Sequence, residues 1–410
     1  MKKKNLILIS IICICVLAAV TGIIFGVRAS KADKTLTVGF YNTTESIQQA
    51  LTKLVQDYAD KNEKTIEFYN FDSKSDFYSQ VQKHKVDLIF APDGYAVKNA
   101  VSAATDGAGF SDIDLSELFS TMIGSTKIKD KKYSAIPLVF DNFEIDIEVS
   151  SFKMSGMSAI ATWKHIEEFS QIQKAKIDYP ASFAGAEPVL LLDLFGALGE
   201  AMEGKEAYDK AAEILIQAAN SGDFDAKEVV NKLFINPDAP IPYSMYYLQQ
   251  YVRKGYITPS AQYLKHTDIN FYIQQRVTNL FFTTLSLHRT YDTKAIERFS
   301  SIYVPSKARP EQRHFTANIT FAVPVSKKAD NEALVQELIS TASQASLSQL
   351  TGLAPVLANC PTPDKQSDDA RFWIAATSTP VAGLGHEAAF TVEELQQLAK
   401  EINQVLFEFQ

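Results

Sequence analysis

Apolar and polar residues alternate along the first part of the chain in a way that predicts strands and helices in turn. Residues 36–41 form a short apolar run typical of a strand, and residues 46–61 place apolar side chains at helical spacing. A second strand is predicted at 65–71, and a short helix at 76–84 leads into a third strand at 86–90. Such alternation indicates right-handed βαβ units and a parallel sheet, on which ligands bind at the carboxyl ends of the strands.

A different pattern follows at residues 133–151, which include a stretch where apolar and acidic residues alternate strictly. The stretch 143–149 reads Phe-Glu-Ile-Asp-Ile-Glu-Val, so its acidic side chains share one face of a long strand. The carboxylates of Glu144, Asp146 and Glu148 offer ligands for a cation. However, ligands two residues apart on one strand rarely enclose a metal without a turn. We therefore expect a strand face exposed to water, and neither a metal nor a cofactor.

The remainder of the chain is predicted to be mainly helical. Residues 161–270 are rich in helical pattern and in tyrosine, and further strands are expected at 301–305 and 319–325. A terminal helix is predicted at 391–407, because it opens on Thr-Val-Glu-Glu, the pattern of a capping box.

Residues 1–32 predict export to a membrane. Three lysines precede Asn5–Val27, an uncharged and mostly apolar stretch that is long enough to span a bilayer. This order is typical of an export signal that places the rest of the chain outside the cytoplasm. Ser30-Lys31-Ala32 fits a small-x-small cleavage site, so a cleaved signal peptide and a retained N-terminal membrane anchor both stay open. Cys13 and Cys15 make the chain a lipoprotein candidate, but each follows an isoleucine, which favours simple apolar packing.

Composition narrows the classes of function. The 410 residues carry 40 basic and 48 acidic side chains, a net charge of −8, and five of the basic residues but no acidic residue fall within the first 32. The rest of the chain is therefore more acidic still, which argues against nucleic acid and against docking on anionic lipid. Beyond residue 32 the one cysteine is Cys360, so no intramolecular disulfide is possible there.

The sequence lacks the short motifs of common enzymes. It contains no GxSxG, HExxH, P-loop or GxGxxG pattern, and its six histidines have no zinc-ligand spacing. No pair of carboxylates stands out by its spacing as a glycosidase pair. We therefore expect a protein that is not an enzyme.

Several segments, in order, resemble the extracellular solute-binding proteins that serve ABC importers, most closely the carbohydrate-binding group. The likeness spans about 320 residues. In the first half of the chain, the segments that resemble the family are the leader with residues 36–59, Val86-Asp-Leu-Ile89 followed by Asp93-Gly94, and Tyr133-Ser-Ala-Ile-Pro137-Leu with its long strand. Further along, they are Ala161-Thr-Trp163 with Glu168-Phe169, the stretch from Phe271 to Asn279, and the stretch from Thr320-Phe-Ala-Val-Pro324 to Pro355.

The resemblance implies an α/β, periplasmic-binding-protein-like fold with two lobes. Each lobe has a central sheet, and a ligand cleft lies between the lobes. We expect residues 33–145 and 271–325 in lobe 1, and residues 146–270 and 326–410 in lobe 2 with the C-terminal helices. The implied function is capture of a small ligand by hinge closure, with sugar as the favoured ligand class, followed by delivery to the membrane permease subunits of an ABC importer.

The same resemblance implies where ligand contacts fall. The expected set is Asn42, Thr43, Asp93, Tyr95, Asp141, Asn142, Glu187, Tyr243, Ser286 and Trp373. Each has a structural alternative. The residues at the strand ends and Glu187 could instead cap helices. Asp141 and Asn142 could instead form hydrogen bonds at the hinge, and Trp373 could instead pack as a lid over a small core. Trp163 is expected in the core.

Two other functions remain open. A membrane-anchored sensor or assembly protein would keep the fold without import, and the absence of a tryptophan after Phe282, where carbohydrate binders often have one, favours this alternative. A glycan hydrolase of the cell envelope, using two carboxylates in the cleft, is the other.

Overall fold

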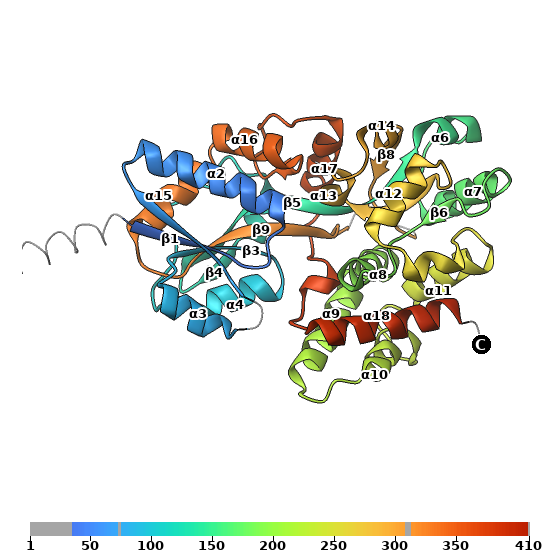
Figure 1. Cartoon of the computed structure of the whole chain (residues 1–410), viewed down its shortest axis with the longest axis horizontal. Coiled ribbons are helices and arrows are strands. Elements are labelled where there is room, and N and C mark those ends of the chain that lie inside the picture. Colours follow the sequence, from blue (N-terminus) through green and yellow to red (C-terminus); the bar gives the residue numbers. More distant parts are fainter. Residues whose placement is uncertain (1–34, 73–74, 308–312, 409–410) are drawn as a thin grey trace, which may run out of the picture.

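A computed structural model of the chain describes residues 35–72, 75–307 and 313–408, and these form two lobes joined side by side (Figure 1). Residues 1–34, where the signal or anchor segment is predicted, lie outside this range. No helix within it is long and apolar enough to cross a bilayer.

Lobe 1 is built on a mixed sheet covered by helices. Its strands are β1 (Thr35–Phe40), β2 (Thr65–Asn70), β3 (Leu88–Pro92), β4 (Lys127–Lys129), the first part of β5 (Lys132–Glu148), β9 (Ala317–Pro324) and β10 (Ala354–Pro355). Its helices are α2 (Glu45–Lys61), α3 (Phe77–His84), α4 (Tyr95–Ala103), α5 (Ser120–Ser125), α15 (Ala329–Leu338), α16 (Thr341–Thr351) and α17 (Lys365–Ala375). β1 pairs in parallel with β2 and with β3, which confirms the predicted βαβ units, and β9 joins them antiparallel.

Lobe 2 has a smaller sheet and more helix. Its strands are the end of β5, β6 (Ala181–Ser182), β7 (Leu280–Thr284) and β8 (Phe299–Ile302). Its helices are α6 (Val149–Ser155), α7 (Trp163–Lys174), α8 (Pro188–Glu203), α9 (Lys205–Asn220), α10 (Ala226–Val230), the π-helix η1 (Asn231–Ile235), α11 (Pro242–Arg253), η2 (Pro259–Tyr263), α12 (His266–Gln274), α13 (Leu285–His288), α14 (Thr293–Ile296), η4 (Leu384–His386) and α18 (Val392–Phe407). The capping box at the start of α18 is present as predicted, between Thr391 and Glu394.

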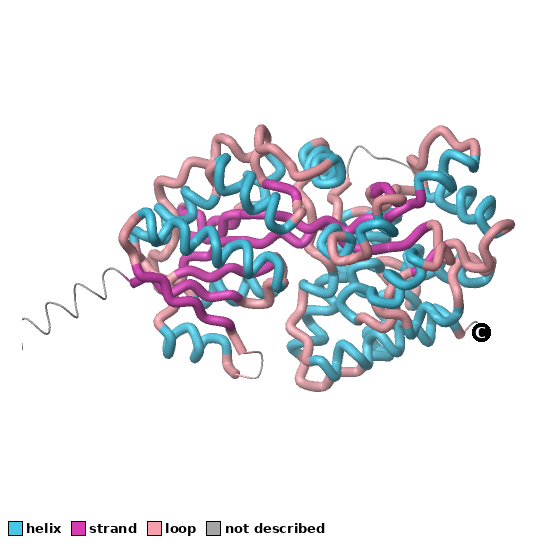
Figure 2. Tube along the Cα trace, turned by 45° about the horizontal axis from the view of Figure 1, so that its top comes forward, coloured by secondary structure: helices cyan, strands magenta, loops and turns pink. Residues whose placement is uncertain are grey.

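The strand β5 belongs to both sheets. Residues 136–142 pair with β9 in lobe 1, whereas residues 143–148 pair with β7 on one edge and β8 on the other in lobe 2. Figure 2 shows the strands as a band that runs from one lobe into the other. The two cores are nevertheless separate, so the lobes are distinct bodies linked by a shared strand.

The two cores correct the expected lobe boundaries. Most buried apolar residues from 273 to 304 pack in the core of lobe 2, with Leu285 in the core of lobe 1 as the exception, and buried apolar residues from 315 to 374 pack in the core of lobe 1. The expectation had assigned 271–325 to lobe 1 and 326–410 to lobe 2. The cause is the strand pairing, because β7 and β8 bind the second half of β5 and carry their flanking helices with them.

The prediction that one face of the long strand is exposed to water is wrong. Glu144 and Asp146 are fully buried, and Glu148 is 9% exposed. Polar side chains from other elements, rather than water, cover this face, since Ser301 contacts both Glu144 and Asp146. Burial, together with the neighbouring Asp146 carboxylate, raises the pKa of Glu144 well above its ordinary value. Trp163 is 2% exposed, which confirms its place in the core.

Candidate ligand-binding cleft

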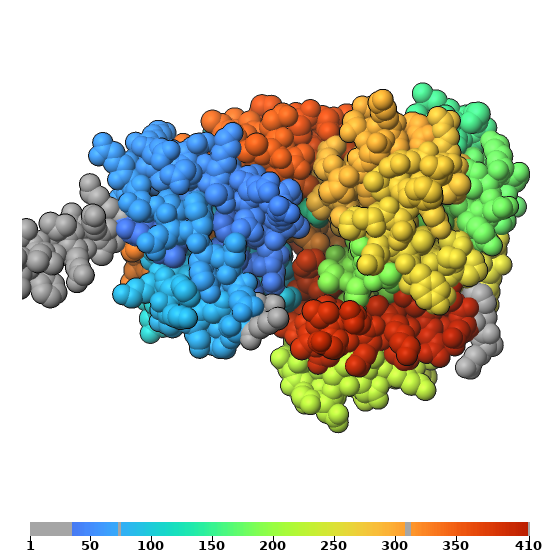
Figure 3. Space-filling model, in the orientation of Figure 1, coloured from blue at the N-terminus to red at the C-terminus, as the bar shows by residue number. Residues whose placement is uncertain are grey.

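A cavity of about 420 Å³ lies between the two lobes. Figure 3 shows the hollow between the blue surface of lobe 1 and the yellow, green and red surface of lobe 2. The residues that line the cavity are Asn42, Thr43, Thr44, Ile47, Pro92, Asp141, Ala186, Glu187, Pro188, Val189, Leu190, Asp193, Thr284, Ser286, Leu287, Asn318, Thr320 and His386. They come from the ends of β1, β3 and β7, from β5 and β9, from the starts of α2 and α8, from α13, and from η4.

Five of the ten residues expected from the sequence meet in this cavity. They are Asn42, Thr43, Asp141, Glu187 and Ser286. The strand-end argument explains Asn42 and Thr43, which follow β1 directly. The other three come from both lobes, so only the fold brings them together.

Asp141 lies at the floor of the cavity, where β5 passes between the lobes. Its carboxylate accepts hydrogen bonds from the backbone N–H of Ser286 at 2.8 Å and from the Ser286 hydroxyl at 2.5 Å. Burial raises the pKa of Asp141 to about 6, although the bonds from Ser286 favour the charged form. A second carboxylate, that of Asp193, acts in the same direction as burial.

Asp193 is the second buried carboxylate of the cleft and is 2% exposed. It accepts a hydrogen bond from the backbone N–H of Gly385 at 2.9 Å and one from the Asn318 side chain at 3.3 Å, and His386 Nε2 lies 3.7 Å away. Burial raises the pKa of Asp193 against these favourable contacts. A Cβ at Gly383 would lie 2.1 Å from Asp193 Oδ1, so this position needs glycine.

Sequence reasoning missed Asp193, Asn318 and His386. One signal for Asp193 was present, because it is the only charged residue in the apolar run Val189–Leu198. A charge buried on the apolar side of a helix requires partners, and here Asn318 and Gly385 provide them. No comparable signal marked Asn318 or His386.

Asn42 is held in position by Tyr95. The backbone of Asn42 has φ +56, in the left-handed region, and its side-chain Nδ2 donates to the Tyr95 hydroxyl at 2.5 Å. Burial raises the pKa of Tyr95 to about 12, so this hydroxyl keeps its proton. Tyr95 therefore supports the cavity through Asn42 without lining it.

Glu187 stands where α8 begins, but its side chain does not cap that helix. Instead, its Oε1 accepts a bond from the backbone N–H of His266 at 3.2 Å and lies 2.6 Å from His266 Nδ1. Its side chain stays 25% exposed, which leaves it able to contact a ligand.

The other expected residues lie elsewhere. Asp93 accepts a bond from the N–H of Gly94 and pairs with Lys127 at 3.2 Å. Asn142, on β5, is buried, and its side chain donates to Glu144 at 2.9 Å. Tyr243 is 47% exposed under the Lys307 ammonium, and Trp373 packs edge-on against Tyr303. None of these four side chains lines the cavity, and each contacts other parts of the protein instead.

The lobes also touch at the rim of the cleft. Gly94, at the start of α4 in lobe 1, has φ +91, and a Cβ there would lie 2.0 Å from the carbonyl oxygen of His386 in lobe 2. One turn later, Lys98 pairs with Glu387 at 2.8 Å. The glycine therefore allows a backbone-to-backbone approach between the lobes.

The charged side chains that line the cavity determine which ligands it can bind. Among the described residues that line it, His386 is the only one able to carry a positive charge, against the carboxylates of Asp141, Asp193 and Glu187. The rest of the described lining combines hydroxyl and amide side chains with an aliphatic part that includes Ile47, and it contains no Phe, Tyr or Trp side chain. The site thus offers hydrogen-bond acceptors and an apolar surface, and it disfavours an anion.

No family model and no curated protein matches the sequence. Solved structures match it throughout, however. The bacterial solute receptor AcbH, described as exclusively preferring β-D-galactopyranose, superposes with a TM-score of 0.66 at 12% identity, over 90% of this chain and 96% of its own. The chain has the fold of the solute-binding proteins.

Two further solved structures support this assignment. A chitin oligosaccharide binding protein gives a TM-score of 0.63 at 15% identity and covers 91% of this chain and 98% of its own. RafE from Streptococcus pneumoniae gives 0.62 at 14% identity, with 92% and 98% covered. The predicted two-lobe α/β fold and the resemblance to carbohydrate-binding solute receptors are therefore confirmed at the level of the fold.

Proposed function

We propose that this protein is an extracytoplasmic receptor that captures a small, neutral, polyhydroxylated ligand, a sugar, in the cleft between its lobes. The observation that carries the proposal is the pair of buried carboxylates, Asp141 and Asp193, in a cavity shared by both lobes. The fold supports the same function, since the similar structures described above are binding proteins for sugars or oligosaccharides.

The cavity matches the chemistry of a sugar. Hydroxyl groups of the ligand donate to Asp141 and Asp193, while Asn42 and Asn318 supply amide groups that both donate and accept. The aliphatic wall, which includes Leu287, packs against the C–H surface of the ring. The volume falls within the ordinary range for small-molecule sites.

Capture follows from the arrangement of the lobes. Ligand contacts come from α8 and α13 in lobe 2 and from the β1 end and β9 in lobe 1, so a bound ligand stabilises the state in which both lobes reach it. The contact between Gly94 and His386 is then part of the closed rim.

After capture, the protein delivers its ligand to a membrane importer. The export signal predicted for residues 1–32 places the receptor outside the cytoplasm and near a membrane, through a cleaved signal or a retained anchor. The permease subunits of an ABC importer would then receive the ligand from the closed form. One similar structure is a sugar transporter component from Bacillus licheniformis in complex with stachyose.

A calorimetric titration tests the proposal. The full chain, purified in detergent, is titrated with a panel of neutral mono- and oligosaccharides and with a uronic acid of matched size. We expect binding heat from at least one neutral sugar, weaker binding of the matched anion, and weaker binding of the sugar in Asp193→Asn. Asp209→Asn, an exposed aspartate on α9, is the matched control. Heat from no neutral sugar would overturn the proposal.

One observation favours an alternative function. The described lining contains no aromatic side chain, whereas aromatic rings are common partners for sugar faces. A receptor-like sensor or assembly protein, anchored at the membrane and not coupled to import, would need no such ring. Absence of sugar binding, with a stable and folded protein, would favour this alternative.

A further inference from the structure

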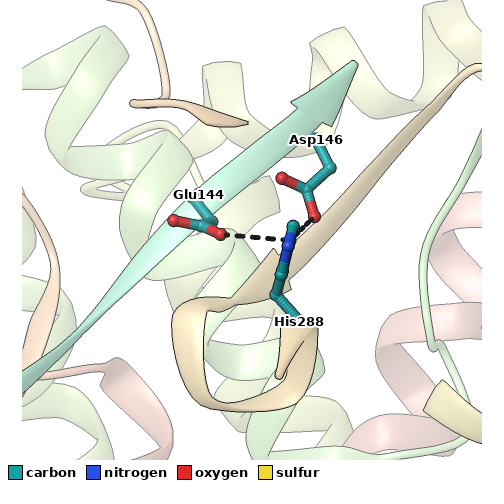
Figure 4. Close-up of side chains that lie close together, drawn as sticks. All are labelled: Glu144, Asp146 and His288. Atoms are coloured by element: carbon teal, nitrogen blue, oxygen red, sulfur yellow. Dashed lines mark hydrogen bonds and ion pairs between the residues drawn. The ribbon is translucent and has the colours of Figure 1, made fainter. Parts of the chain in front are cut away.

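A compact group of metal-ligating side chains lies beneath the cleft, on the face of β5 that is turned away from the apolar core of lobe 2. Glu144 and Asp146 are fully buried and His288, at the end of α13, is 6% exposed. Figure 4 shows both carboxylates projecting from one strand toward the same imidazole. None of these three residues lines the cavity, so the group is separate from the proposed sugar site.

The donor atoms already lie at near-coordination spacing. His288 Nδ1 is 2.6 Å from Asp146 Oδ2 and 3.8 Å from Glu144 Oε1, and one donor atom from each residue falls within 4.8 Å of the others. Bonds of about 2.0–2.2 Å in a tetrahedral zinc site separate neighbouring donors by about 3.3 Å. The two observed distances lie on either side of that value, so small side-chain shifts suffice.

The charges in the group do not balance. Two carboxylates face one imidazole, and among residues 35–72, 75–307 and 313–408 no lysine or arginine pairs with either carboxylate. Buried carboxylates are costly without a cation or a proton to offset them. Protonated His288 offsets at most one of the two charges.

The two carboxylates also share a hydrogen-bond donor. The Ser301 hydroxyl lies 2.9 Å from Glu144 Oε1 and 2.6 Å from Asp146 Oδ1, and its single hydrogen can serve one of them at a time. Gln366 Nε2 also donates to Glu144 Oε1. These contacts hold the two carboxylates side by side.

An unpartnered oxygen adds an independent observation. The Asn142 side chain is 2% exposed and turned toward the group, because its Nδ2 donates to Glu144 Oε2 at 2.9 Å. Its carbonyl oxygen, Oδ1, has no hydrogen-bond partner. Buried amide oxygens without a partner are rare, and this one belongs to a side chain that is bonded to Glu144, a member of the group. A cation held beside Glu144 would satisfy it.

We propose that Glu144, Asp146 and His288 bind a zinc-type divalent cation, with the Asn142 carbonyl oxygen as the fourth ligand. The imidazole selects a transition metal over Ca²⁺ or Mg²⁺, which prefer oxygen ligands throughout. Ser301 and Gln366 hold the carboxylates in place, since Gln366 Nε2 donates to Glu144 Oε1 at 2.7 Å.

The position of the site gives it a structural task. β5 carries three of the four proposed ligands, α13 carries the imidazole, and Gln366 reaches in from α17, whose apolar residues belong to the core of lobe 1. A bound ion would therefore stabilise the junction at which β5 passes from lobe 1 into lobe 2. This inference does not depend on the ligand of the cleft.

Zinc binding by the full chain tests the proposal directly. The protein is dialysed against chelator and titrated with zinc chloride, and anomalous diffraction at the zinc edge locates the ion. We expect one ion per chain between the three side chains, and a rise in Tm that chelator reverses. No binding, or an ion located elsewhere, would overturn the proposal.

Matched variants identify the ligands. Glu144→Gln and His288→Gln each preserve most of the local shape and should weaken zinc binding at least tenfold while remaining folded by circular dichroism. His165→Gln removes a histidine on α7, outside the group, and should bind zinc as the unaltered chain does. Unchanged affinity in both site variants would contradict the proposal, and a sugar titration on the same samples reports separately on the cleft.

Discussion

Asp193 on α8 of lobe 2 accepts a hydrogen bond from Asn318 on β9 of lobe 1, at 3.3 Å, inside the cavity that the lobes share. The second oxygen of the carboxylate is fixed by the backbone N–H of Gly385. This pair links the lobes across the cleft and leaves a buried, oriented acceptor beside the space for a ligand. The central features of the site follow from it.

Replacing Asp193 by asparagine should weaken ligand binding. Asparagine keeps an acceptor for Gly385 but loses a charged acceptor for a ligand hydroxyl, and hydrogen bonds to charged groups contribute about 1.5–3 kcal/mol. We expect affinity to fall roughly 10- to 150-fold in calorimetry, with little change in Tm. Equal affinity in Asp193→Asn and in the Asp209→Asn control would show that this carboxylate does not touch the ligand.

Asp141 should make stability depend on pH. Its pKa is about 6 in the folded protein and near 3.9 for an ordinary aspartate, so between these values the unfolded chain has lost the proton that the folded chain retains. The free energy of unfolding should therefore fall as pH rises from 4 to 6, by up to about 3 kcal/mol, and then level off. Urea unfolding of the unaltered chain and of Asp141→Asn measures this difference, which should vanish below pH 4. A difference that grows as pH falls would contradict the assignment.

The same carboxylate should make ligand binding depend on pH in the opposite sense. A ligand hydroxyl that donates to Asp141 favours its charged form, so binding lowers its pKa and releases a proton. Affinity should rise as pH increases through about 6, and Asp141→Asn should flatten the profile. Calorimetry in buffers of different ionisation enthalpy detects the released proton, and proton uptake instead of release would refute the proposed contact.

Gly94 should be required for the contact between the lobes. An alanine Cβ would meet the His386 carbonyl oxygen at 2.0 Å and would sit on a backbone with φ +91, so Gly94→Ala should force the rim apart. We expect a larger radius of gyration in X-ray scattering and weaker ligand binding. Gly156→Ala is the matched control, because Gly156 also has a positive φ but has no atom within 4 Å of an added Cβ. Equal scattering curves for the two variants would disprove the role of this contact.

Tyr95 should act through Asn42. Tyr95→Phe removes the hydroxyl that accepts from Asn42 Nδ2, leaving the amide free to turn away from the cavity. We expect a loss of affinity of about 0.5–1.5 kcal/mol, the usual range for one neutral hydrogen bond. Tyr78→Phe, at a largely exposed tyrosine of α3, controls for loss of a hydroxyl. A loss equal to that of the control would place Asn42 outside the ligand contacts.

The sequence predicts the helices and strands whose pattern is local. The strand–helix units from β1 to β3 and the capping box of α18 appear where the pattern placed them, and Asn42 lies at the strand end where ligands were expected. The lobe boundaries could not be read in this way, because they depend on β7 and β8 pairing with the far half of β5. Pairing between strands that are distant in sequence leaves no local pattern.

The face of β5 shows a second limit of sequence patterns. Alternation places Glu144 and Asp146 on one face correctly, but it does not distinguish a face covered by water from one covered by polar side chains. Asn318 and His386 illustrate the same limit in the cleft. Each is an unremarkable polar residue until β9 and η4 bring it to Asp193.

The most direct test of the receptor function is a crystal structure of the full chain with a neutral sugar that binds in calorimetry. The account predicts density for one sugar between the lobes, with its hydroxyls bonded to the Asp141 and Asp193 carboxylates and its ring against the aliphatic wall. A sugar bound outside this cavity, or a cavity that stays empty at saturating sugar, would contradict it.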